Sequence, residues 1–480
     1  MPNYESVIGL ETHIQLNTKS KIFCGCKADS WDDLANKNIC PICVGLPGVL
    51  PSLNKSVVEK AVLLALAVEA DSIQPISYLE RKNYFYPDLP KGFQISQYAE
   101  PLARGGRLII PSADGDDRLV NIQKLHIEED AGKTVHQNGK RLIDFNRCGI
   151  PLVEMVTDPD IRSADEAAAY LIRLRVLLRW LGISEADMER GQLRCDANVS
   201  IRMLGEDSLN PKTEIKNINS IENVRAAIKT EIKRQIQVVE AGQTIKAWTL
   251  GWDEDTETLR KMRSKETEAD YRYFREPDLL PIRIDEEWLA AIKSSLPELP
   301  LARRKRFSLD YGLPDYDAVI LTEERSLSSY FEATVNLGGA DPKTISNWVM
   351  NDVLRLIKET KVPAAGLHLI PKYLAEIIEM VESGTITRGT GKDLLIKVED
   401  TGKPPMELVE FEGLGQVSDD ETLKTLAMTI VTQNPKQVAT YKAGKTTILG
   451  WFVGQLMRET KGRADAKLVQ SIFQELLNNA

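Results

Sequence analysis

Three stretches of this chain alternate apolar with polar or ionisable side chains, and this alternation constrains the fold more than any other feature. In the stretch 7–16, Glu11, His13 and Gln15 occupy alternate positions, and mostly apolar residues occupy the positions between and around them. The stretches 124–130 and 194–201 repeat the pattern. Successive side chains of a β-strand point to opposite faces, so each stretch predicts a strand with one polar face and one face in a core. Together they predict an antiparallel sheet with helices on its apolar side and carboxylates along its open side.

The polar face of this sheet is unusually acidic. Any one strand would suit an ordinary solvated face, but two of the four histidines of the chain lie among these carboxylates. Glu154 lies within the apolar run 151–156, and Glu214 shares a face with Lys216. Concentrated acid repels itself unless a cation lies between the groups, and oxygen-rich ligands favour Mg²⁺ or Mn²⁺ over zinc. The pattern therefore predicts a divalent-metal site.

Basic residues in the same part of the chain complete a site for a nucleotide triphosphate. Their charged groups can contact phosphate oxygens beside a metal ion. The candidates for ATP binding are Arg81, Lys82, Arg147, Arg194, Lys216 and Arg272. Two fragments at 389–392 and 444–446 look like parts of a P-loop, but both lack the first glycine of a Walker A motif, so neither is a P-loop.

Bulk properties limit the class of protein. A chain of 480 residues is too long for one hydrophobic core and predicts about two to four domains. Its formal net charge of −9 argues against a nonspecific nucleic-acid coat, although a local basic patch remains compatible with it. The N-terminal residues show no leader pattern, and the longest apolar stretch, 61–68, is too short for a membrane span. We expect a cytoplasmic enzyme or enzyme subunit with no membrane segment.

Composition shifts divide the chain into three expected domains. Strand-like alternation mixed with helical periodicity indicates a catalytic domain over 1–292, which ends before a proline-containing break at 296–300. Helical periodicity then predicts a helical domain over 293–408, with a second break at 402–405. The remainder, 409–480, is expected to be a helical tail domain.

Charge reverses along the tail. Residues 397–421 contain eight Asp or Glu and two Lys, whereas residues 435–467 contain seven Lys or Arg and two acids. The bases are Lys436, Lys442, Lys445, Arg458, Lys461, Arg463 and Lys467. Clustered bases of this kind can contact several phosphates of a nucleic acid.

Four of the six cysteines form two close pairs, Cys24 with Cys26 and Cys40 with Cys43. Two such pairs separated by a short loop can close a tetrahedral thiolate site, so we expect a structural zinc ion with no open position for substrate. The alternative is a metal-free thiol loop, because the first pair is CxC and not the commoner CxxC. The remaining Cys148 and Cys195 lie in apolar contexts that are typical of small core residues.

Short motifs along nearly the whole chain resemble one family. They cover residues 7–13, 81–88, 91–96, 125–133, 146–151, 193–198, 214–217 and 270–274. In order and spacing they are similar to the B subunit of the aspartyl/glutamyl-tRNA(Asn/Gln) amidotransferase. The resemblance implies an α+β fold, with an N-terminal antiparallel-sheet domain like those of glutamine synthetase and guanido kinases, followed by all-helical domains. It also implies a YqeY-like tail domain that binds the tRNA body.

The resemblance implies an ATP-dependent carbon–nitrogen ligase that works as part of a heterotrimer. The B subunit would phosphorylate the side-chain carboxylate of mischarged Glu-tRNA(Gln) or Asp-tRNA(Asn), and ammonia would then form Gln-tRNA(Gln) or Asn-tRNA(Asn). The A subunit, an amidase, would release that ammonia from glutamine, and a small C subunit would clasp the two. This division agrees with the sequence, which shows neither a cysteine in a glycine-framed elbow nor a Gly/Ser-rich amidase signature.

The resemblance also assigns roles to positions in the acidic strands. The residues expected to bind Mg²⁺ and ATP are Glu11, His13, Glu128 and Glu154, with Asp196 and Glu129 as further metal candidates. Glu128 and Glu129 are adjacent, and alternation alone leaves open which of them is the ligand. Glu11, His13, Glu128 and Lys82 are the expected catalytic residues.

An aromatic segment is the expected entrance for the second substrate. Lys82, Asn83 and Tyr84 would line the path of ammonia or the pocket for the aminoacyl end of the tRNA, although plain core packing is the alternative for the aromatic residues at 84–86. Arg275 departs from the family pattern, in which proline is expected at this position. Because arginine does not fix φ as proline does, the turn there can differ locally.

Two other functions fit parts of the sequence. A non-catalytic tRNA-binding scaffold would use the basic tail and leave the acid cluster purely structural. A free-standing ligase of the glutamine synthetase type would act on a small amino acid, and the basic tail argues against it. ATP hydrolysis that depends on aminoacyl-tRNA distinguishes the amidotransferase function from the scaffold.

Overall fold

The computed structural model describes residues 4–111, 117–264, 268–415, 420–460 and 462–479. The chain divides into two compact units, Met1–Leu299 and Pro300–Ala480. The expected domain boundary at 292/293 lies within the helix α4 (Glu286–Ser294), whereas the division after Leu299 lies in the expected break at 296–300.

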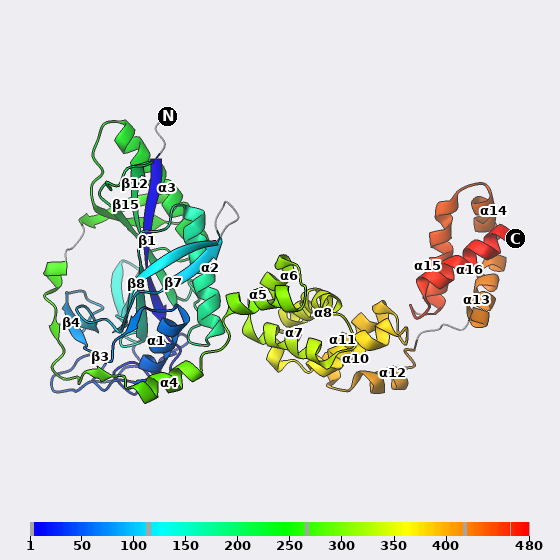
Figure 1. Ribbon diagram of the computed structural model, residues 1–480, viewed down its shortest axis with the longest axis horizontal. Helices are drawn as coiled ribbons and strands as arrows, with labels where there is room; N and C mark the ends of the chain where they lie inside the picture. The colour runs from blue at the N-terminus through cyan, green and yellow to red at the C-terminus, as the bar shows by residue number, and fades with distance from the viewer. Residues whose placement is uncertain (1–3, 112–116, 265–267, 416–419, 461, 480) are drawn as a thin grey trace. The chain divides into compact units, whose positions relative to one another are not determined.

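A ten-stranded mixed sheet forms the centre of the first unit (Figure 1). Its hydrogen-bonded order is β15 (Thr258–Ser264), β14 (Trp248–Asp253), β13 (Thr213–Lys216), β12 (Leu193–Met203), β1 (Tyr4–Gln15), β11 (Pro151–Thr157), β8 (Asp117–Glu129), β6 (Ala103–Arg104) and β2 (Ser72–Ile73), and β7 (Arg107–Pro111) also pairs with β8. Its described strand pairs are antiparallel except for β13 and β14, which run parallel. The long central strand β1 lies between β11 and β12.

Three helices cover the apolar face of this sheet. They are α1 (Lys55–Ala67), α2 (Ala164–Trp180) and α3 (Ile221–Glu240), of which α2 and α3 lie side by side (Figure 1). Each begins at a residue whose side chain accepts a hydrogen bond from a backbone N–H of the first turn, namely Asn54, Ser163 and Ser220.

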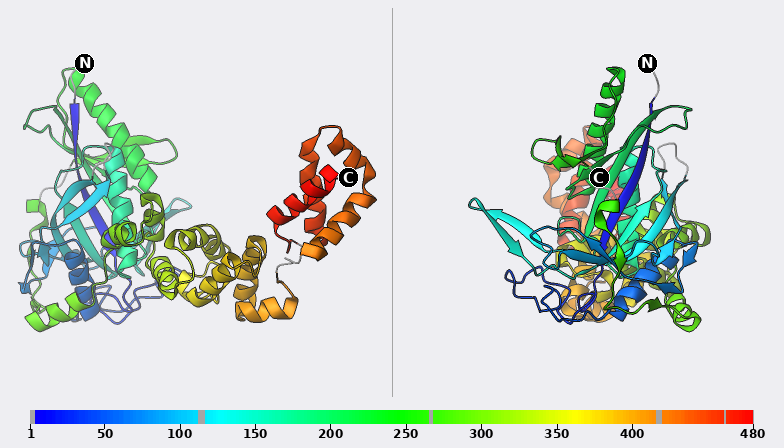
Figure 2. Two further views of the ribbon diagram at one scale, coloured as in Figure 1. Left: turned by 45° about the vertical axis from the view of Figure 1, so that its right-hand side comes forward. Right: turned by 90° about the vertical axis from the view of Figure 1, so that its left-hand side faces the viewer.

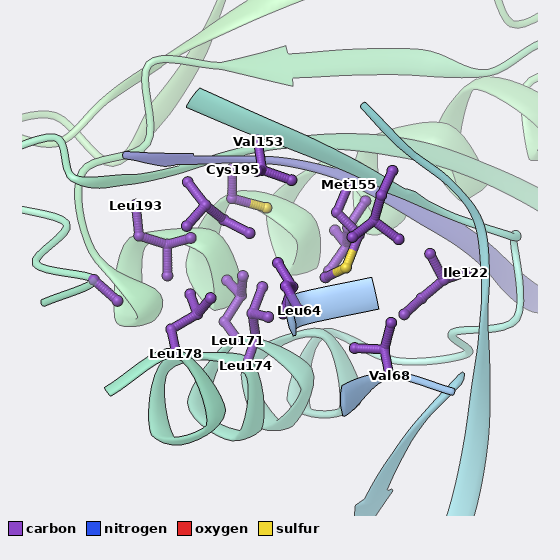
Figure 3. Close-up of a cluster of buried hydrophobic side chains, with 14 of the residues drawn as sticks. Leu64, Val68, Ile122, Val153, Met155, Leu171, Leu174, Leu178, Leu193 and Cys195 are labelled. Carbon is purple, nitrogen blue, oxygen red and sulfur yellow. The ribbon is translucent and has the colours of Figure 1, made fainter. Parts of the chain in front are cut away.

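Side chains from helices and strands interlock in the core between them. Figure 3 shows Leu171 and Leu174 of α2 pointing toward Val153 and Cys195 of the sheet. The even-numbered apolar residues of β1 belong to the same buried cluster. The helices thus occupy the side of the sheet that alternation marked as apolar, and Cys195 is a core residue.

A small three-stranded sheet lies over one end of the polar face. It consists of β16 (Phe274–Arg275), β4 (Glu80–Asn83) and β5 (Phe93–Ser96). The Oγ of Ser96 on β5 donates a hydrogen bond to Glu128 on β8 at 3.2 Å. Part of the face expected to be open is therefore covered. Arg275 adopts strand conformation opposite Glu80, and its guanidinium lies 3.6 Å from the ring centroid of Tyr78.

The remaining strands of the first unit form short pairs. The hairpin β9 (Lys133–Gln137) and β10 (Lys140–Asp144) extends away from the main sheet as a two-stranded ribbon (Figure 2, right). The strands β3 (Ile76–Ser77) and β17 (Ile282–Arg283) pair near α4.

The described part of the second unit is helical, as the periodicity of this part of the sequence predicted. Its α-helices are α5 (Pro300–Asp310), α6 (Asp315–Leu321), α7 (Arg325–Leu337), α8 (Pro342–Trp348), α9 (Leu354–Thr360), α10 (Pro371–Glu382), α11 (Arg388–Thr401), α12 (Pro405–Glu412), α13 (Asp420–Gln433), α14 (Pro435–Lys442), α15 (Leu449–Glu459) and α16 (Ala466–Asn479). A π-helical turn, Val349–Val353, joins α8 to α9.

Two separate hydrophobic clusters stabilise this unit. The first runs from Phe307 to Val409, and the second runs from Leu423 to Leu477. Leu408 and Val409 of α12 are both buried in the first cluster. The residues that pack together therefore continue past the expected boundary at 408/409.

Candidate functional site

Four ionisable residues form one row across four neighbouring strands. His13 on β1 is the cross-strand partner of Arg194 on β12 and of Glu154 on β11. Glu154 in turn faces His126 on β8. Directly opposed residues on one face of an antiparallel sheet have their Cβ atoms about 5 Å apart. The register alone therefore brings together residues that are 181 positions apart in the sequence, which is the separation of His13 and Arg194.

Two carboxylates and two imidazoles come together here, because Glu128 lies two residues from His126 along β8 and reaches both histidines. The Nε2 atom of His13 lies 3.3 Å from Glu154 Oε2 and 3.6 Å from Glu128 Oε1. The Nε2 atom of His126 lies 3.4 Å from Glu154 Oε2 and 3.7 Å from Glu128 Oε2. Ligand atoms of His13, Glu128 and Glu154 all lie within 4.8 Å of one another, which is close enough for one metal ion. We call these three residues the acidic triad.

Glu128 is the most buried member of the triad, His13 is half-buried, and the charges of the triad and of His126 influence one another. Glu128 is only 2% exposed. Burial alone would lower the pKa of His126, but Glu154 and Glu128 raise it to about 9. Burial alone would likewise raise the pKa of Glu154, but His126 and His13 hold it well below its usual range. His126 also lowers the pKa of Glu128 against the effect of burial. Both shifts favour the charged carboxylate, which is the form that ligates a cation.

Lys82 on β4 adds a positive charge beside the triad. Its Nζ atom lies 4.9 Å from the ring centroid of Tyr271 and 6.0 Å from that of Tyr84. Burial alone would lower the pKa of Lys82, but Glu128, together with Tyr273 and Glu154, raises it above its usual range. Lys82 therefore stays protonated between the triad and the rings of Tyr84 and Tyr271.

The neighbouring aromatic residues are fixed by hydrogen bonds and ring contacts. Tyr84 donates a hydrogen bond from its hydroxyl to Gln94 Oε1 at 3.1 Å. Asn83 donates from Nδ2 to the carbonyls of Tyr271 and Arg272 at 3.1 and 2.8 Å. Tyr84 packs at the site, whereas the side chain of Phe85 is largely exposed.

Glu129 lies apart from the triad. Its carboxylate forms a buried ion pair with Lys91 and accepts a hydrogen bond from the backbone N–H of Ile95 at 2.9 Å. Consecutive strand residues point to opposite faces, so Glu128 and Glu129 cannot both face His13. The structure thus places Glu128, and not Glu129, beside His13.

Glu11 and Asp196 lie on the same face as the triad but outside it. They are cross-strand partners on β1 and β12. Glu11 accepts a hydrogen bond from Asn198 Nδ2 at 2.9 Å, and Asp196 pairs with Lys216 at 2.6 Å. Each carboxylate is thus held by a neighbouring side chain, next to the triad along β1 and β12.

A large cleft opens beside the triad. Its volume is about 700 Å³, and it extends from His13 to the loop around Trp31. This size is within the range of small-molecule sites in proteins. Its lining is rich in bases, which are Lys133, Arg147, Arg190, Arg194 and Lys216.

The expected ATP ligands separate into two groups. Arg147, Arg194 and Lys216 line the cleft. Arg194 binds Asp130 at 3.0 Å, while its buried Nε atom has no hydrogen-bond partner among the described residues. A buried unsatisfied donor at the wall of a cleft is suited to a ligand oxygen.

Arg81 and Arg272 do not line this cleft. The guanidinium of Arg81 forms two hydrogen bonds with Glu276 at 2.6 and 2.8 Å and lies 4.1 Å from the ring centroid of Phe93. Its charge is therefore used inside the fold. Arg272 is exposed, and its φ of 45° places it in the left-handed region. Both arginines belong to motifs that resemble the family, but the motifs alone did not indicate that their side chains lie outside the cleft.

Three cleft residues were not predicted from the sequence. Trp31 lies at the rim with 52% of its surface exposed, and Lys133 and Arg190 lie 6.0 and 5.4 Å from its ring centroid. Trp31 belongs to the loop between the two cysteine pairs, and Arg190 to the turn before β12. Only Lys133 lies in one of the recognised motifs, so the tertiary fold alone brings the three together.

The four paired cysteines form a compact cluster. The Sγ atoms of Cys24, Cys26, Cys40 and Cys43 all lie within 4.8 Å of one another. A hydrogen bond from Cys24 lowers the pKa of Cys43 to about 5 against the effect of burial, and Lys21 acts in the same direction. Four converging sulfur atoms are the donor set of a closed tetrahedral site.

The tail presents most of its bases to solvent. The exposed ones are Lys436, Lys442, Lys445, Arg458 and Lys467. Arg463 is partly buried and donates hydrogen bonds to the carbonyls of Thr460 and Gly413. Lys461 lies outside the described residues. Across the described part of the chain, the helices are all too short or too polar to cross a membrane.

The chain matches known proteins along its length. Residues 6–290 match the family described as the GatB/GatE catalytic domain, and residues 329–477 match the GatB domain. The B subunit of the aspartyl/glutamyl-tRNA(Asn/Gln) amidotransferase of Thermodesulfovibrio yellowstonii is 48% identical over 475 residues, which cover 99% of both sequences. The corresponding protein of Chlorobium phaeobacteroides is 48% identical over 477 residues, with 99% and 100% covered, and that of Crocosphaera subtropica is 46% identical over 487 residues, with 99% and 98% covered. The chain belongs to the family of aspartyl/glutamyl-tRNA(Asn/Gln) amidotransferase B subunits.

Proposed function

We propose that this chain activates mischarged tRNA for amide formation. It uses ATP to phosphorylate the side-chain carboxylate of Glu-tRNA(Gln) or Asp-tRNA(Asn), and ammonia then displaces the phosphate. The observation that carries the proposal is that His13 of the acidic triad lines a cleft of about 700 Å³ whose lining also includes five bases. A metal-binding group beside a cationic cleft is the arrangement that phosphoryl transfer requires.

The residues of the triad fit Mg²⁺. His13, Glu128 and Glu154 offer one nitrogen and two carboxylate donors within 4.8 Å of one another, and Mg²⁺ is usually held by one or two carboxylates together with substrate phosphates. When bound, Mg²⁺ would neutralise charge on the transferred phosphoryl group. Glu11 and Asp196 lie on the same face and would orient groups around that ion.

The cleft bases would hold the triphosphate. Lys216 and Arg147 lie in the cleft with His13. Burial alone would lower the pKa of Lys216, but Asp196 and Glu214 raise it, so Lys216 stays protonated and would contact phosphate oxygens beside its ion pair with Asp196. The Nε of Arg194, for which the described part of the chain offers no acceptor, is a further donor. Positioning and charge stabilisation of this kind supply most of the catalysis in phosphoryl transfer.

The reaction then proceeds in two balanced steps. A carboxylate oxygen of the aminoacyl group attacks the γ-phosphorus of ATP, and the bond to ADP breaks. Ammonia next attacks the acyl carbon, inorganic phosphate leaves with the electrons of its C–O bond, and the nitrogen loses a proton. Lys82 is protonated beside Glu128, so it acts as a fixed positive charge near the acyl phosphate and not as a base.

Ammonia would come from a partner amidase. The remaining cysteines, Cys148 and Cys195, are both buried, and burial raises the pKa of Cys148 to about 12 and that of Cys195 well above its usual range. A buried neutral thiol is a poor nucleophile, so neither suits glutamine hydrolysis. We infer a heterotrimer with an amidase A subunit and a small C subunit, and Lys82, Asn83 and Tyr84 on the ammonia path.

The other parts of the chain have supporting roles in this proposal. The cysteine cluster would bind a structural Zn²⁺, and the helical tail, with five exposed bases at positions 436–467, would contact the tRNA body. The mainly antiparallel sheet with a metal-binding face supports a catalytic domain of the glutamine synthetase type. The proposed domains are therefore a catalytic cradle, a connecting helical domain and a tRNA-binding tail.

ATP turnover by the purified heterotrimer tests the proposal. We expect ADP release to require both Mg²⁺ and a mischarged tRNA, and to be absent with the correctly charged tRNA. If ADP release is absent under all conditions while the tRNA still binds, the chain is a scaffold. If free glutamate replaces mischarged tRNA, the chain is a small-molecule ligase.

A further inference from the structure

Lys21 is buried in an unusual way. Its side chain is 0% exposed, and it is the one lysine among the buried residues that the structure describes. A buried ammonium is costly unless an anion compensates its charge. The position of Lys21 therefore points to a negative charge close to its Nζ atom.

The contacts of Lys21 identify where that charge must lie. Its Nζ atom donates hydrogen bonds to the carbonyl of Asn38 at 2.9 Å and to the Sγ of Cys43 at 3.8 Å. Among the described residues, no carboxylate forms an ion pair with it. The cysteine cluster is thus the anionic partner of Lys21.

Only a cluster that contains thiolates can compensate the positive charge of Lys21. Neutral thiols or disulfides would leave Lys21 uncompensated, whereas Zn²⁺ with four thiolates keeps a net negative formal charge. The backbone N–H of Cys40 also donates to Cys43 Sγ at 3.2 Å, which is a further stabilising contact for a charged sulfur.

We propose that Lys21 is the counter-charge that stabilises a metal–thiolate centre at Cys24, Cys26, Cys40 and Cys43. The proposal rests on the zinc-binding role given to this cluster above. It assigns Lys21 as a positioning residue that touches one ligand sulfur and sets the affinity of the centre for the metal ion.

Hydrogen bonds connect the cysteine cluster to residues of the large cleft. The N–H of Asn38 donates to Asn146 Oδ1 at 2.8 Å, and Asn146 Nδ2 donates to the carbonyl of Leu34 at 2.8 Å. Asn146 lines the large cleft, as does Trp31 from the loop between the cysteine pairs. Lys21, through Asn38, therefore connects the metal–thiolate centre to one wall of the cleft.

Cobalt binding to the apo form of the full chain tests Lys21 directly. Thiolate-bound Co²⁺ gives a charge-transfer absorption band that follows metal loading without any activity assay. Lys21→Gln keeps a donor for the Asn38 carbonyl but removes the charge, Lys21→Arg keeps the charge, and Lys27→Gln is the matched control because Lys27 is an exposed partner of Asp33.

The proposal makes a ranked set of expectations. Lys21→Gln should weaken Co²⁺ binding by about tenfold to a hundredfold, the usual effect of losing a residue that supports metal ligands. Lys21→Arg should stay within about threefold of the unmodified chain, and Lys27→Gln should bind equally well. Release of Zn²⁺ to a chelator, followed with a colorimetric indicator, should accelerate in the same order.

Two results would overturn the inference in distinguishable ways. If the unmodified chain shows no thiolate–cobalt band, the cluster binds no metal ion, and the zinc role fails with it. If the band forms and Lys21→Gln binds Co²⁺ as tightly as Lys27→Gln, the metal centre stands but Lys21 is not its counter-charge. Should Lys21→Gln fail to fold, a Lys21→Arg variant that releases Zn²⁺ much more than about threefold faster than Lys27→Gln would also contradict the proposal.

Discussion

Glu154 and His13 are direct cross-strand partners on β11 and β1, and 3.3 Å separates Glu154 Oε2 from His13 Nε2. The same oxygen lies 3.4 Å from Nε2 of His126, on the other side of β11. Glu154 is therefore the central residue of the row, and a change there should affect the site more than a change at either histidine.

Replacing Glu154 by Gln should remove divalent-metal binding while keeping the shape of the side chain. Because even residues that only support ligands change metal affinity by about tenfold to a hundredfold, we expect a loss of at least about a hundredfold. The measurement is Mn²⁺ binding to the full chain, followed by electron paramagnetic resonance.

Glu129→Gln is the control for this prediction, since Glu129 pairs with Lys91 away from the triad. It should bind Mn²⁺ within about threefold of the unmodified chain. A loss in Glu129→Gln together with normal binding in Glu154→Gln would show that the ion lies elsewhere.

Lys216→Met should weaken ATP binding by roughly tenfold to a hundredfold, because a hydrogen bond to a charged group contributes about 1.5–3 kcal/mol. Lys216 lines the cleft, whereas Arg272 does not. Arg272→Gln should therefore leave the dissociation constant of ATP unchanged in isothermal titration calorimetry. Equal effects of the two substitutions would place the triphosphate outside the cleft.

Arg81→Met should destabilise the fold without acting on ATP directly. It would leave the buried carboxylate of Glu276 without its two guanidinium hydrogen bonds, and breaking such a pair costs about 3–5 kcal/mol. Urea unfolding of the full chain should show this loss of free energy, while the ATP dissociation constant of the folded variant changes little. A normal unfolding curve with weakened ATP binding would restore Arg81 as a nucleotide ligand.

Inactivating the nucleophile of the partner amidase should abolish the use of glutamine but not the use of ammonium. The buried thiols of Cys148 and Cys195 offer no second glutaminase, so the heterotrimer should still form product from ammonium chloride. Formation of Gln-tRNA is the measurement. Failure of ammonium to rescue product would mean that this chain does not perform the activation step as proposed.

Removing the tail after Gly415 should weaken tRNA binding and leave the fold of the rest intact. The tail has its own hydrophobic cluster from Leu423 to Leu477, so the cut leaves the other clusters whole. The salt slope of KM for aminoacyl-tRNA should fall by about one unit for each phosphate contact removed. An unchanged KM with a collapsed kcat would instead make the tail part of the active site.

Alternation along the long strands predicted which side chains share one face of the sheet. His13 and Glu128 were expected on the polar face, because side-chain direction in a strand is fixed by position, whereas Glu154 lies in an apolar run and was expected in the site only from the family resemblance. Alternation could not decide between Glu128 and Glu129 until the register with β11 and the pairing with Lys91 were known. Cross-strand register is a property of the tertiary fold and has no local signal in the sequence.

Loops and long side chains were harder to place. Arg81 lies in the same basic motif as Lys82, yet one forms an internal ion pair and the other approaches the triad. The sequence did not predict that Trp31 lines the cleft, because its position depends on how the loop between the cysteine pairs folds against the cleft. The covering of one end of the polar face by β5 was likewise unexpected, since that strand has only four residues.

The most direct test of the central claim is ATP hydrolysis by the heterotrimer carrying Glu128→Gln, with glutamine hydrolysis by the partner amidase as the internal control. The substitution removes one carboxylate of the triad and keeps the hydrogen bond that Ser96 can donate. We predict that hydrolysis of ATP dependent on mischarged tRNA falls by at least about a hundredfold, while glutamine hydrolysis persists. Unchanged tRNA-dependent ATP hydrolysis in this variant would contradict the assignment of the triad as the phosphoryl-transfer site.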